Sequence, residues 1–350
     1  MPLPSLLEDL LTAHGPSGYE AAPAAVWRRH AGAFAGVETD VMGSSVARVP
    51  GTAAGRTVAV VGHIDEIGLI VTHVSDEGFL HFIGVGGWDA QILVGQRVEL
   101  ATRGGRVLGV IGKKPIHLLK EDDRKKVAEI KDLHIDVGAK DGDEARELVR
   151  IGDVAVIAGE PVELPNGRLA SRSLDNRLGA YVALEAARLV AQDGGAPGEV
   201  VAVASVQEEI TFAGARTTAY ALEPDVAVVV DVTHATDAPG IEVREIGKHE
   251  LGSGPVIERG SIISPTVFEL LHDTAEAEGI PFTVAASARS TGTDADAVHI
   301  SRAGIPTGVV SIPLRYMHSP VELVQLDDVE ATAKLVAAFA RRLDEASFER

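Results

Sequence analysis

The chain has 350 residues, of which 45% are hydrophobic, and its 51 acidic and 32 basic side chains give a formal net charge of −19. A surface of that sign argues against nucleic acid and anionic membranes as partners, because both attract basic patches. No cysteine is present, which excludes disulfides and thiolate metal sites, leaves histidine and carboxylates as the strong metal ligands, and favours a cytoplasmic location.

Residues 1–67 begin with helical patterns and end in a strand. Apolar residues recur at helical spacing over 3–15 and 19–34, and "TVAVVGHID" over 57–65 predicts a short buried strand. The first eleven residues carry acids where a secretory signal carries bases, so we expect no targeting segment. No apolar run approaches the roughly 18 residues that span a bilayer.

Residues 68–164 change to short strands separated by glycines, as in "GFLHFIGVGG" and "VAVIAGEPVEL". The Gly104–Gly105 pair between two apolar runs predicts a hairpin over 96–112. Only residues 141–152 have the spacing of a helix within this segment. The segment is therefore predicted to form a small β-rich domain.

From residue 165 to residue 350, helical and strand patterns alternate. The helical patterns cover 175–192, 264–279, 293–304 (which Asp294 would cap) and 327–346, and the strand patterns cover 199–207, 225–231 and 307–318. Strands separated by helices imply a mostly parallel sheet with helices on both faces. We therefore predict an α/β domain made of residues 1–67 and 165–350, interrupted by a β-rich insertion of residues 68–164.

Four of the apolar strands end in a potential metal ligand. His63 and Asp65 follow "TVAVVG", Glu208 and Glu209 follow "EVVAVASVQ", Asp231 follows "DVAVVV", and His318 follows "TGVVSIPLRYM". A further acid, Asp175, lies on a turn just before a helix. Because open parallel sheets bind ligands beyond the carboxyl ends of their strands, we expect all of these side chains to meet at one edge.

Each of these residues, taken singly, has an ordinary structural alternative. His63 could be a hydrogen-bonded core histidine, and Asp231 a turn residue at a strand end. His318 could simply precede a turn, and Asp175 could be the N-cap of the following helix. Taken together, these alternatives leave like charges that repel by roughly 4 kcal/mol per pair at contact distance. One or two divalent cations remove that cost, and mixed imidazole and carboxylate ligands favour zinc, cobalt or manganese over calcium.

The adjacent acids Glu208 and Glu209 suggest a division of roles. Neighbouring residues on an extended strand point to opposite sides, so one glutamate would bind metal and the other would handle a proton. A metal-bound water has a pKa near 7, and a carboxylate beside it can take its proton as the water attacks a carbonyl. Asp65 has the spacing to hold the imidazole of His63 in place. The alternative is that both glutamates are solvated loop residues.

Several segments resemble the signature segments of the TET-type aminopeptidases, which are co-catalytic metallopeptidases that include glutamyl and leucyl aminopeptidases. They are "GHIDEIGLIVTHV", "SLDNRLGAYVALE", "VQEE", "VVVDVTHATDAPG" and "SIPLRYMHSP", and the similarity extends to "GGWDAQILVGQRV" and "KDLHIDVGA" in the insertion. The resemblance covers nearly the whole chain. It implies removal of N-terminal residues from peptides with two divalent metal ions per subunit, Zn²⁺ or Co²⁺ first and Mn²⁺ as a third choice.

The resemblance also implies a role at each matching position. Asp175 would bridge the two metals, His63 and Asp231 would complete one site, Glu209 and His318 would complete the other, Glu208 would be the general base, and Asp65 would orient His63. The insertion would drive self-association into a dimer or a hollow tetrahedral dodecamer that admits unfolded peptides. The segment "ITFAGA" departs from the family pattern at Thr211 and Phe212, so the shape of the substrate pocket is not predicted.

Three rival functions are considered. A related metal-dependent deacylase or carboxypeptidase would use similar chemistry, and only the family-specific segments argue against it. An endoglucanase, a label that some members carry, needs two carboxyls about 5–9.5 Å apart and usually an aromatic platform, whereas aromatic residues make up only 4% of this chain. A non-catalytic assembly protein would have lost ligands or the base. His234 and Asp237 are reserve ligands for Asp231, although a local structural role is favoured for both.

Overall fold

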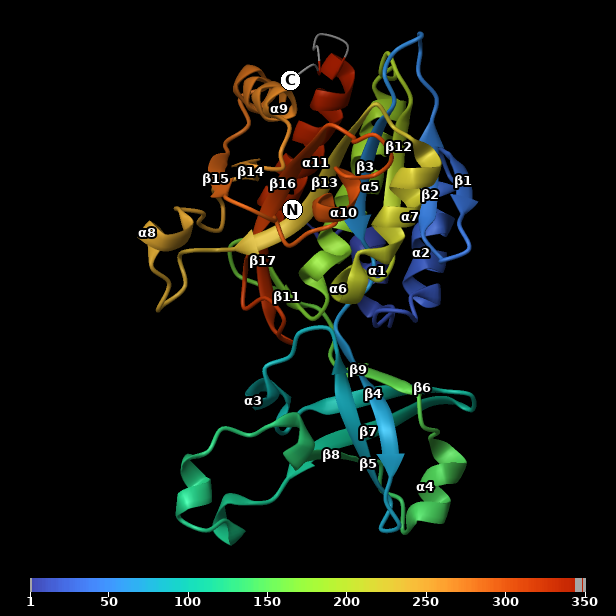
Figure 1. Cartoon of the computed structure of the whole chain (residues 1–350), viewed down its shortest axis with the longest axis vertical. Helices are drawn as coiled ribbons and strands as arrows, with labels where there is room; N and C mark the ends of the chain where they lie inside the picture. The colour runs from blue at the N-terminus through green and yellow to red at the C-terminus, as the bar shows by residue number, and fades with distance from the viewer. Residues whose placement is uncertain (1, 344–347, 349–350) are drawn as a thin grey trace.

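A mixed sheet of eleven strands forms the centre of the larger of two lobes (Figure 1). The computed structural model of the chain describes residues 2–343 and residue 348. The strands are β1 (Gly36–Thr39), β2 (Ser45–Val49), β3 (Val58–His63), β10 (Val162–Leu164), β11 (Arg168–Ser171), β12 (Val200–Ser205), β13 (Val226–His234), β14 (Val256–Gly260), β15 (Thr283–Ser287), β16 (Thr307–Arg315) and β17 (Glu322–Gln325). Their order is β1-β2-β12-β3-β13-β16-β17-β11-β10, with β14 paired to β15 and β16.

The four central strands β12, β3, β13 and β16 run parallel, and most of the outer pairings are antiparallel. The prediction of a mostly parallel sheet therefore holds at the centre and is wrong for most outer pairings, of which β1–β2, β10–β11 and β16–β17 join strands that follow one another in the chain. Every residue of β3 and β12 is buried, as expected for valine-rich strands covered on both faces. Ser205 pairs with His63, so these two strands end at the same edge.

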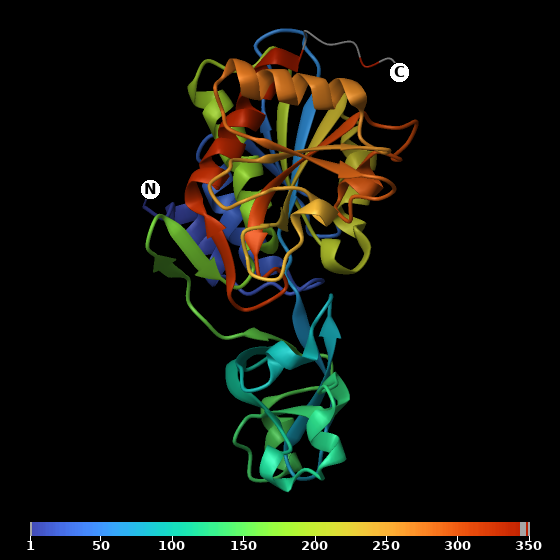
Figure 2. The same cartoon turned by 90° about the vertical axis from the view of Figure 1, so that its left-hand side faces the viewer.

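Helices lie on both sides of this sheet (Figure 2). One side holds α1 (Ser5–Thr12), α2 (Ala21–Ala31), α5 (Leu174–Gln192) and α11 (Leu326–Arg342), and the other holds α7 (Ala213–Leu222) and α10 (Ala295–Val298), while α9 (Pro265–Ala277) packs on α11 and β14. Two glycines bring α5 against β3. A Cβ on Gly62 would lie 2.2 Å from the carbonyl carbon of Gly179, so this close approach just before His63 requires glycine.

Two predicted helices differ from the observed ones. The helix expected over 293–304 is only the single turn α10, and Thr293 rather than Asp294 accepts the N–H of Ala295 at its start. The helix expected over 327–346 is observed as α11, and residues 344–347 of that prediction lie outside the described residues. None of the described helices combines the length and the apolar character that a membrane span requires.

The smaller lobe is a closed barrel with its own apolar core. Its strands are β4 (Gly68–Val74), β5 (Phe79–Val85), β6 (Arg97–Thr102), β7 (Gly105–Lys113), β8 (Leu133–Asp136) and β9 (Val154–Ile157), and its short helices include α3 (Ala90–Leu93), α4 (Gly142–Leu148) and the 3-10 turns η1 (Ile116–Leu118), η2 (Asp122–Lys125) and η3 (Ile130–Asp132). Residues 162–164 fall within the predicted insertion, whereas in the structure they form β10, which pairs with β11 in the large sheet. Both lobes are joined through the chain near residues 67 and 157–162 (Figure 1).

Candidate metal centre

All seven predicted site residues lie at one edge of the large sheet. His63 is the last residue of β3, Asp65 follows it, Glu208 and Glu209 follow β12, Asp231 lies in β13, His318 follows β16, and Asp175 lies at the start of α5. Six of them line a cavity of about 410 Å³, and Asp65 lies beneath them with no exposed surface. The aligned ends of the central parallel strands explain this convergence.

Asp175 contacts both histidines of the cluster, one with each carboxylate oxygen. Its Oδ1 lies 3.2 Å from Nε2 of His63, and its Oδ2 lies 3.3 Å from Nε2 of His318. The N-cap alternative for Asp175 does not apply, because the side chain of Asn176 accepts the N–H of Gly179 in the first turn of α5. The Asp175 carboxylate is thus left for the two imidazoles.

The remaining carboxylates divide between the two histidines. Glu208 Oε2 and Asp231 Oδ1 lie 3.6 Å and 3.9 Å from Nε2 of His63. Glu209 Oε2 lies 3.4 Å from Nε2 of His318. The chain therefore presents two adjoining groups of nitrogen and oxygen donors, with Asp175 between them.

Glu208 and Glu209 do not continue the strand, contrary to the prediction. β12 ends at Ser205, Gln207 adopts a left-handed backbone with φ +60°, and Glu208 begins the single helical turn α6 (Glu208–Thr211). The two side chains are separated because successive helical residues point in directions about 100° apart. Each glutamate reaches a different histidine, although the reason differs from the expected one.

Asp65 binds both the ring of His63 and the backbone of the turn that carries Glu208 and Glu209. Its Oδ1 lies 3.3 Å from Nδ1 of His63, on the opposite side of the ring from the cluster. The same carboxylate accepts the backbone N–H groups of Glu208 and Glu209, each at 3.1 Å. A single buried aspartate therefore places one histidine and both glutamates, and the sequence pattern indicated only the first of these contacts.

The carboxyl groups of the cluster are strongly perturbed. Burial raises the pKa of Glu208 to about 10 and that of Glu209 to about 8, and neighbouring carboxylates add to the rise in each pKa. Burial also raises the pKa of Asp231 well above its usual range. Burial and the neighbouring carboxylates therefore favour the protonated forms of these side chains until a cation takes the place of the protons.

The pKa values of the two histidines are also raised, which favours their charged forms. A hydrogen bond with Asp175 is the main cause that raises the pKa of His318 to about 9. Burial lowers the pKa of His63, but the charge of Glu208 and contacts with Asp175 and Asp65 outweigh it, so the net shift is well upward. Metal binding to such a cluster displaces protons, which makes the affinity for metal depend on pH.

The donor atoms fit divalent ions. Two ligands about 2.1 Å from a common tetrahedral ion lie about 3.4 Å apart. The separations of 3.2 Å, 3.3 Å and 3.4 Å between histidine nitrogens and the oxygens of Asp175 and Glu209 match that value. Oε1 of Glu209 is buried without a hydrogen-bond partner, as expected of an atom that awaits a cation. Imidazole and carboxylate donors suit zinc, cobalt or manganese.

The reserve ligands have other positions. Asp237 pairs with Arg315 through two contacts of 3.0 Å and 2.5 Å, which bears out its expected structural role. His234 is exposed and lines the cavity without joining either donor group. Phe212 lines the same cavity, so the departure from the family pattern does reach the site, whereas Thr211 is not part of the lining.

Three buried acids near the site were missed by sequence reasoning. Glu322 accepts the backbone N–H groups of Asp175 and His318, and Asp294 contacts the hydroxyl of Ser205 beneath the cluster. Glu20 accepts the N–H of Gln207, the residue before Glu208, at 3.1 Å. No spacing rule marks an acid that accepts backbone N–H groups from distant segments, so their sequence context gave no signal.

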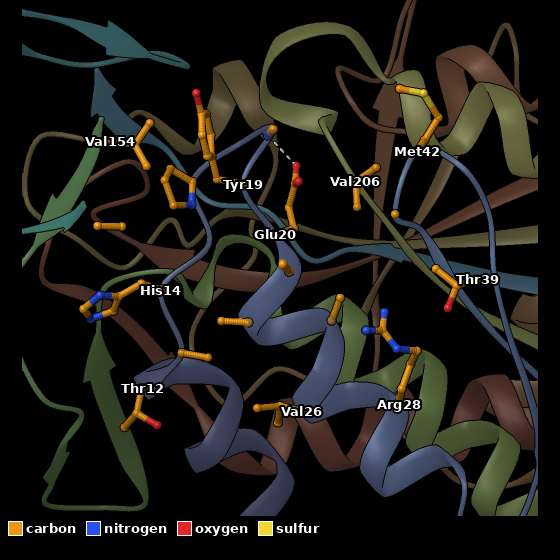
Figure 3. A pocket seen from close by; sticks show the side chains of 18 of the residues that line it. Thr12, His14, Tyr19, Glu20, Val26, Arg28, Thr39, Met42, Val154 and Val206 are labelled. Atoms are coloured by element: carbon orange, nitrogen blue, oxygen red, sulfur yellow. Dashed lines mark hydrogen bonds between the residues drawn. The ribbon is translucent and has the colours of Figure 1, made fainter. Parts of the chain in front are cut away.

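Glu20 belongs to a second and larger cavity of about 950 Å³, shown in Figure 3 with Glu20 between Tyr19 and Val206. Its carboxylate also accepts the N–H of Gly18 at 2.6 Å. None of the candidate metal ligands lines this cavity, and a large volume by itself does not indicate a catalytic site. The smaller cavity with the convergent donors is the candidate active site.

The comparison with protein families agrees with this geometry. Residues 43–335, most of the chain, match the family model of the M42 glutamyl aminopeptidases. The chain belongs to the M42 aminopeptidase family. It is therefore a hydrolase that acts on peptide bonds, and the predicted resemblance to TET-type aminopeptidases is confirmed.

Named M42 relatives are similar over almost their full length. The lysyl aminopeptidase of Pyrococcus furiosus is 38% identical over 316 residues, which are 89% of this chain and 88% of the relative. A TET aminopeptidase from a marine sediment archaeon of the Thaumarchaeota superposes with a TM-score of 0.92 at 37% identity, covering 97% of this chain and 96% of that one. The TET1 peptidase of Pyrococcus horikoshii, which can assemble into a tetrahedron or a large octahedral shell, has a TM-score of 0.84 at 33% identity, with 96% and 99% coverage.

Proposed function

We propose that this M42 peptidase removes N-terminal residues from peptides with two divalent ions held around Asp175. The observation that supports this most directly is the contact of each Asp175 oxygen with a different histidine. His63 and Asp231 would hold one ion, and Glu209 and His318 would hold the other. The donor set favours Zn²⁺ or Co²⁺, with Mn²⁺ also compatible.

The bound ions would lower the pKa of water and stabilise the oxyanion that forms as a peptide carbonyl is attacked. Glu208 lines the cavity without being needed as a ligand, and its proposed role is that of general base. Its carboxylate takes a proton from the attacking water and returns it to the nitrogen of the leaving peptide. Asp65 keeps Glu208 in reach by binding its backbone N–H, and it keeps the His63 ring oriented.

The rest of the cavity favours neutral N-terminal side chains. Apart from the cluster, the lining consists of Phe212, Val232, Thr233, His234, Thr291, Gly292, Thr293 and Met317. None of these offers a fixed charge to a lysyl or glutamyl side chain, and burial of an unpaired charge is costly. We therefore expect leucyl and methionyl substrates to be cleaved faster than lysyl or glutamyl ones.

Self-association through the barrel is part of the proposal. Large apolar side chains are exposed on β5, β7 and η1, namely Ile83, Leu108, Val110, Ile116 and Leu118. The dodecamer and the tetrahedral shell of Pyrococcus horikoshii TET1 support a dodecamer of this chain, and a dimer stays the alternative. Light scattering should show a smaller particle for Leu108→Asp, while Val41→Asp, a change at an exposed valine of the large lobe, should leave the mass unchanged. A cytoplasmic location stays a prediction from the sequence.

The deciding experiment combines elemental analysis of the purified protein with a panel of substrates. We expect two divalent ions per subunit and hydrolysis of aminoacyl anilides that carry a free amine. Faster cleavage of N-acylated amino acids or of C-terminal residues would favour the deacylase or carboxypeptidase alternative. Activity on cellulose that survives a chelator would favour the endoglucanase alternative, which gives the two histidines of the cluster no role.

A further inference from the structure

Glu322, at the start of β17, joins the backbones of two candidate ligands. Only 2% of its surface is exposed. Its Oε2 accepts the N–H of Asp175 at 3.0 Å, and its Oε1 accepts the N–H of His318, also at 3.0 Å. The side chains of Asp175 and His318 are themselves in contact, so Glu322 closes a loop behind them.

Regular secondary structure fixes neither of these backbones. Asp175 has non-helical torsions of φ −79° and ψ 106° within the first turn of α5. His318 follows β16 and has a left-handed φ of +59°, a backbone conformation that is unfavourable for residues other than glycine. Such conformations persist where the surroundings hold them in place. Glu322 is the side chain that binds both.

A carboxylate at position 322 is unfavourable on electrostatic grounds. It is buried next to a cluster that already contains Asp175 and Glu209, and burial of an additional like charge costs free energy. A carboxylate is, however, the side chain that can accept at both ends. A glutamine would accept at one end and present an N–H donor to the N–H group at the other end.

We propose that Glu322 is a positioning residue that sets the separation of Asp175 and His318, and thereby the affinity of the ion that these residues and Glu209 would hold. The inference rests on the proposed function, because it presupposes that the cluster binds divalent ions. Loss of a partner behind a metal ligand typically lowers metal affinity 10–100-fold. We expect that loss at the ion beside His318, and a smaller one at the ion beside His63.

The chain offers a matched control at Asp328 in the first turn of α11. This aspartate is 1% exposed and also uses both oxygens to accept backbone N–H groups, from Gly252 at 2.7 Å and from Gly254 at 2.8 Å. It contacts none of the candidate ligands. Asp328→Asn therefore reproduces the chemical change and the burial of Glu322→Gln at a site away from the cluster.

The experiment is equilibrium dialysis of the full-length protein against Co²⁺ at a series of free concentrations, with elemental analysis of bound metal. For Glu322→Gln we expect two ions whose second dissociation constant is 10–100-fold higher than in the unmodified protein, with activity restored by excess Co²⁺. For Asp328→Asn we expect both constants to stay within about twofold of the unmodified ones. Unchanged binding by Glu322→Gln, or an equal loss in Asp328→Asn, would overturn the proposal.

A second variant covers the case in which Glu322→Gln does not fold. Glu322→Asp keeps the charge and both acceptor oxygens but is one carbon shorter, so the oxygens are drawn back from the N–H groups of Asp175 and His318, and we expect the same selective weakening. Failure of the proposed function is distinguishable, because the unmodified protein itself would then bind no Co²⁺. If the unmodified protein binds two ions and both Glu322 variants match it, only the positioning role is wrong.

Discussion

Two neighbouring clusters of buried charge differ in where their positive charge comes from. Glu66 is paired with Arg172 and lies 3.0 Å from Arg177, both buried arginines. Burial raises the pKa of Glu66, but the two arginines outweigh that effect and the net shift is downward. One residue earlier in the chain, Asp65 belongs to the metal-ligand cluster.

The ligand cluster contains no arginine or lysine to match its acids. Its two histidines face five carboxylates, those of Asp65, Asp175, Glu208, Glu209 and Asp231. The pKa values of Glu208 and Glu209 rise instead of falling. In the arginine cluster, which consists of Glu66, Arg172 and Arg177, the protein chain itself supplies the positive charge that balances the acid. The ligand cluster requires cations from solution. Changes in the first should alter stability with or without metal, and changes in the second should alter metal binding and catalysis.

The largest effect is expected at the proposed general base. Glu208→Gln should lower kcat for leucyl anilide hydrolysis by about 10²–10⁴-fold, because a positioned acid–base group contributes that much. Metal content should be unchanged, and elemental analysis alongside the kinetics checks it. The matched change Glu199→Gln, at a partly exposed glutamate paired with Arg48, should leave kcat unaltered. Full activity of Glu208→Gln would show that another group handles the proton.

The next effect is on the arginine cluster. Arg177→Ala should destabilise the protein by about 3–5 kcal/mol, because breaking a buried ion pair leaves an uncompensated charge. Arg177 also donates to the carbonyls of Leu10 and Ala13, so both are left without this partner. Denaturant unfolding with and without Zn²⁺ should give the same loss. A loss confined to the metal-loaded protein would mean that the two clusters are not independent.

Asp231→Asn should have the opposite dependence on metal. Burial favours the uncharged form of Asp231, so its replacement by the neutral amide should leave the free energy of unfolding of the metal-free protein within about 1 kcal/mol. The additional stability conferred by Zn²⁺ should shrink, because a ligand has been lost. Thermal unfolding at several Zn²⁺ concentrations measures both quantities. A metal-free Asp231→Asn protein that is much less stable would indicate a structural role for Asp231.

A smaller and graded effect is expected from pH. Glu208 and Glu209 have folded pKa values of about 10 and about 8, above the usual 4.5, so the folded metal-free protein binds more protons than the unfolded one between those limits. Their contribution to the free energy of unfolding is complete below pH 4.5 and is lost gradually as pH rises towards 8–10. Unfolding from pH 5 to 9 should show this decline without metal and a flatter profile with Zn²⁺. Stability profiles that run parallel with and without Zn²⁺ would contradict the claim that cations balance these carboxylates.

The convergence of the site could be predicted from the sequence because parallel strands align their ends. His63 and Ser205 are paired, so the residues that follow β3 and β12 must meet. The turn at Gln207 was not predictable in the same way, since a left-handed glutamine leaves no periodic signal. Glu322 was missed because its role lies in backbone contacts with segments far away in the sequence. The antiparallel outer strands, such as β10, were too short to be assigned to a lobe from their pattern.

The central claim is that cations complete the ligand cluster, and anomalous diffraction tests it most directly. Crystals of undialysed protein, measured at the absorption edge of the metal found by elemental analysis, should show two peaks, one beside His63 and one beside His318, with Asp175 between them. If no peak lies in this cavity after soaking with Zn²⁺ and Co²⁺, or if peaks lie only elsewhere on the molecule, cations do not complete the ligand cluster and the central claim is wrong.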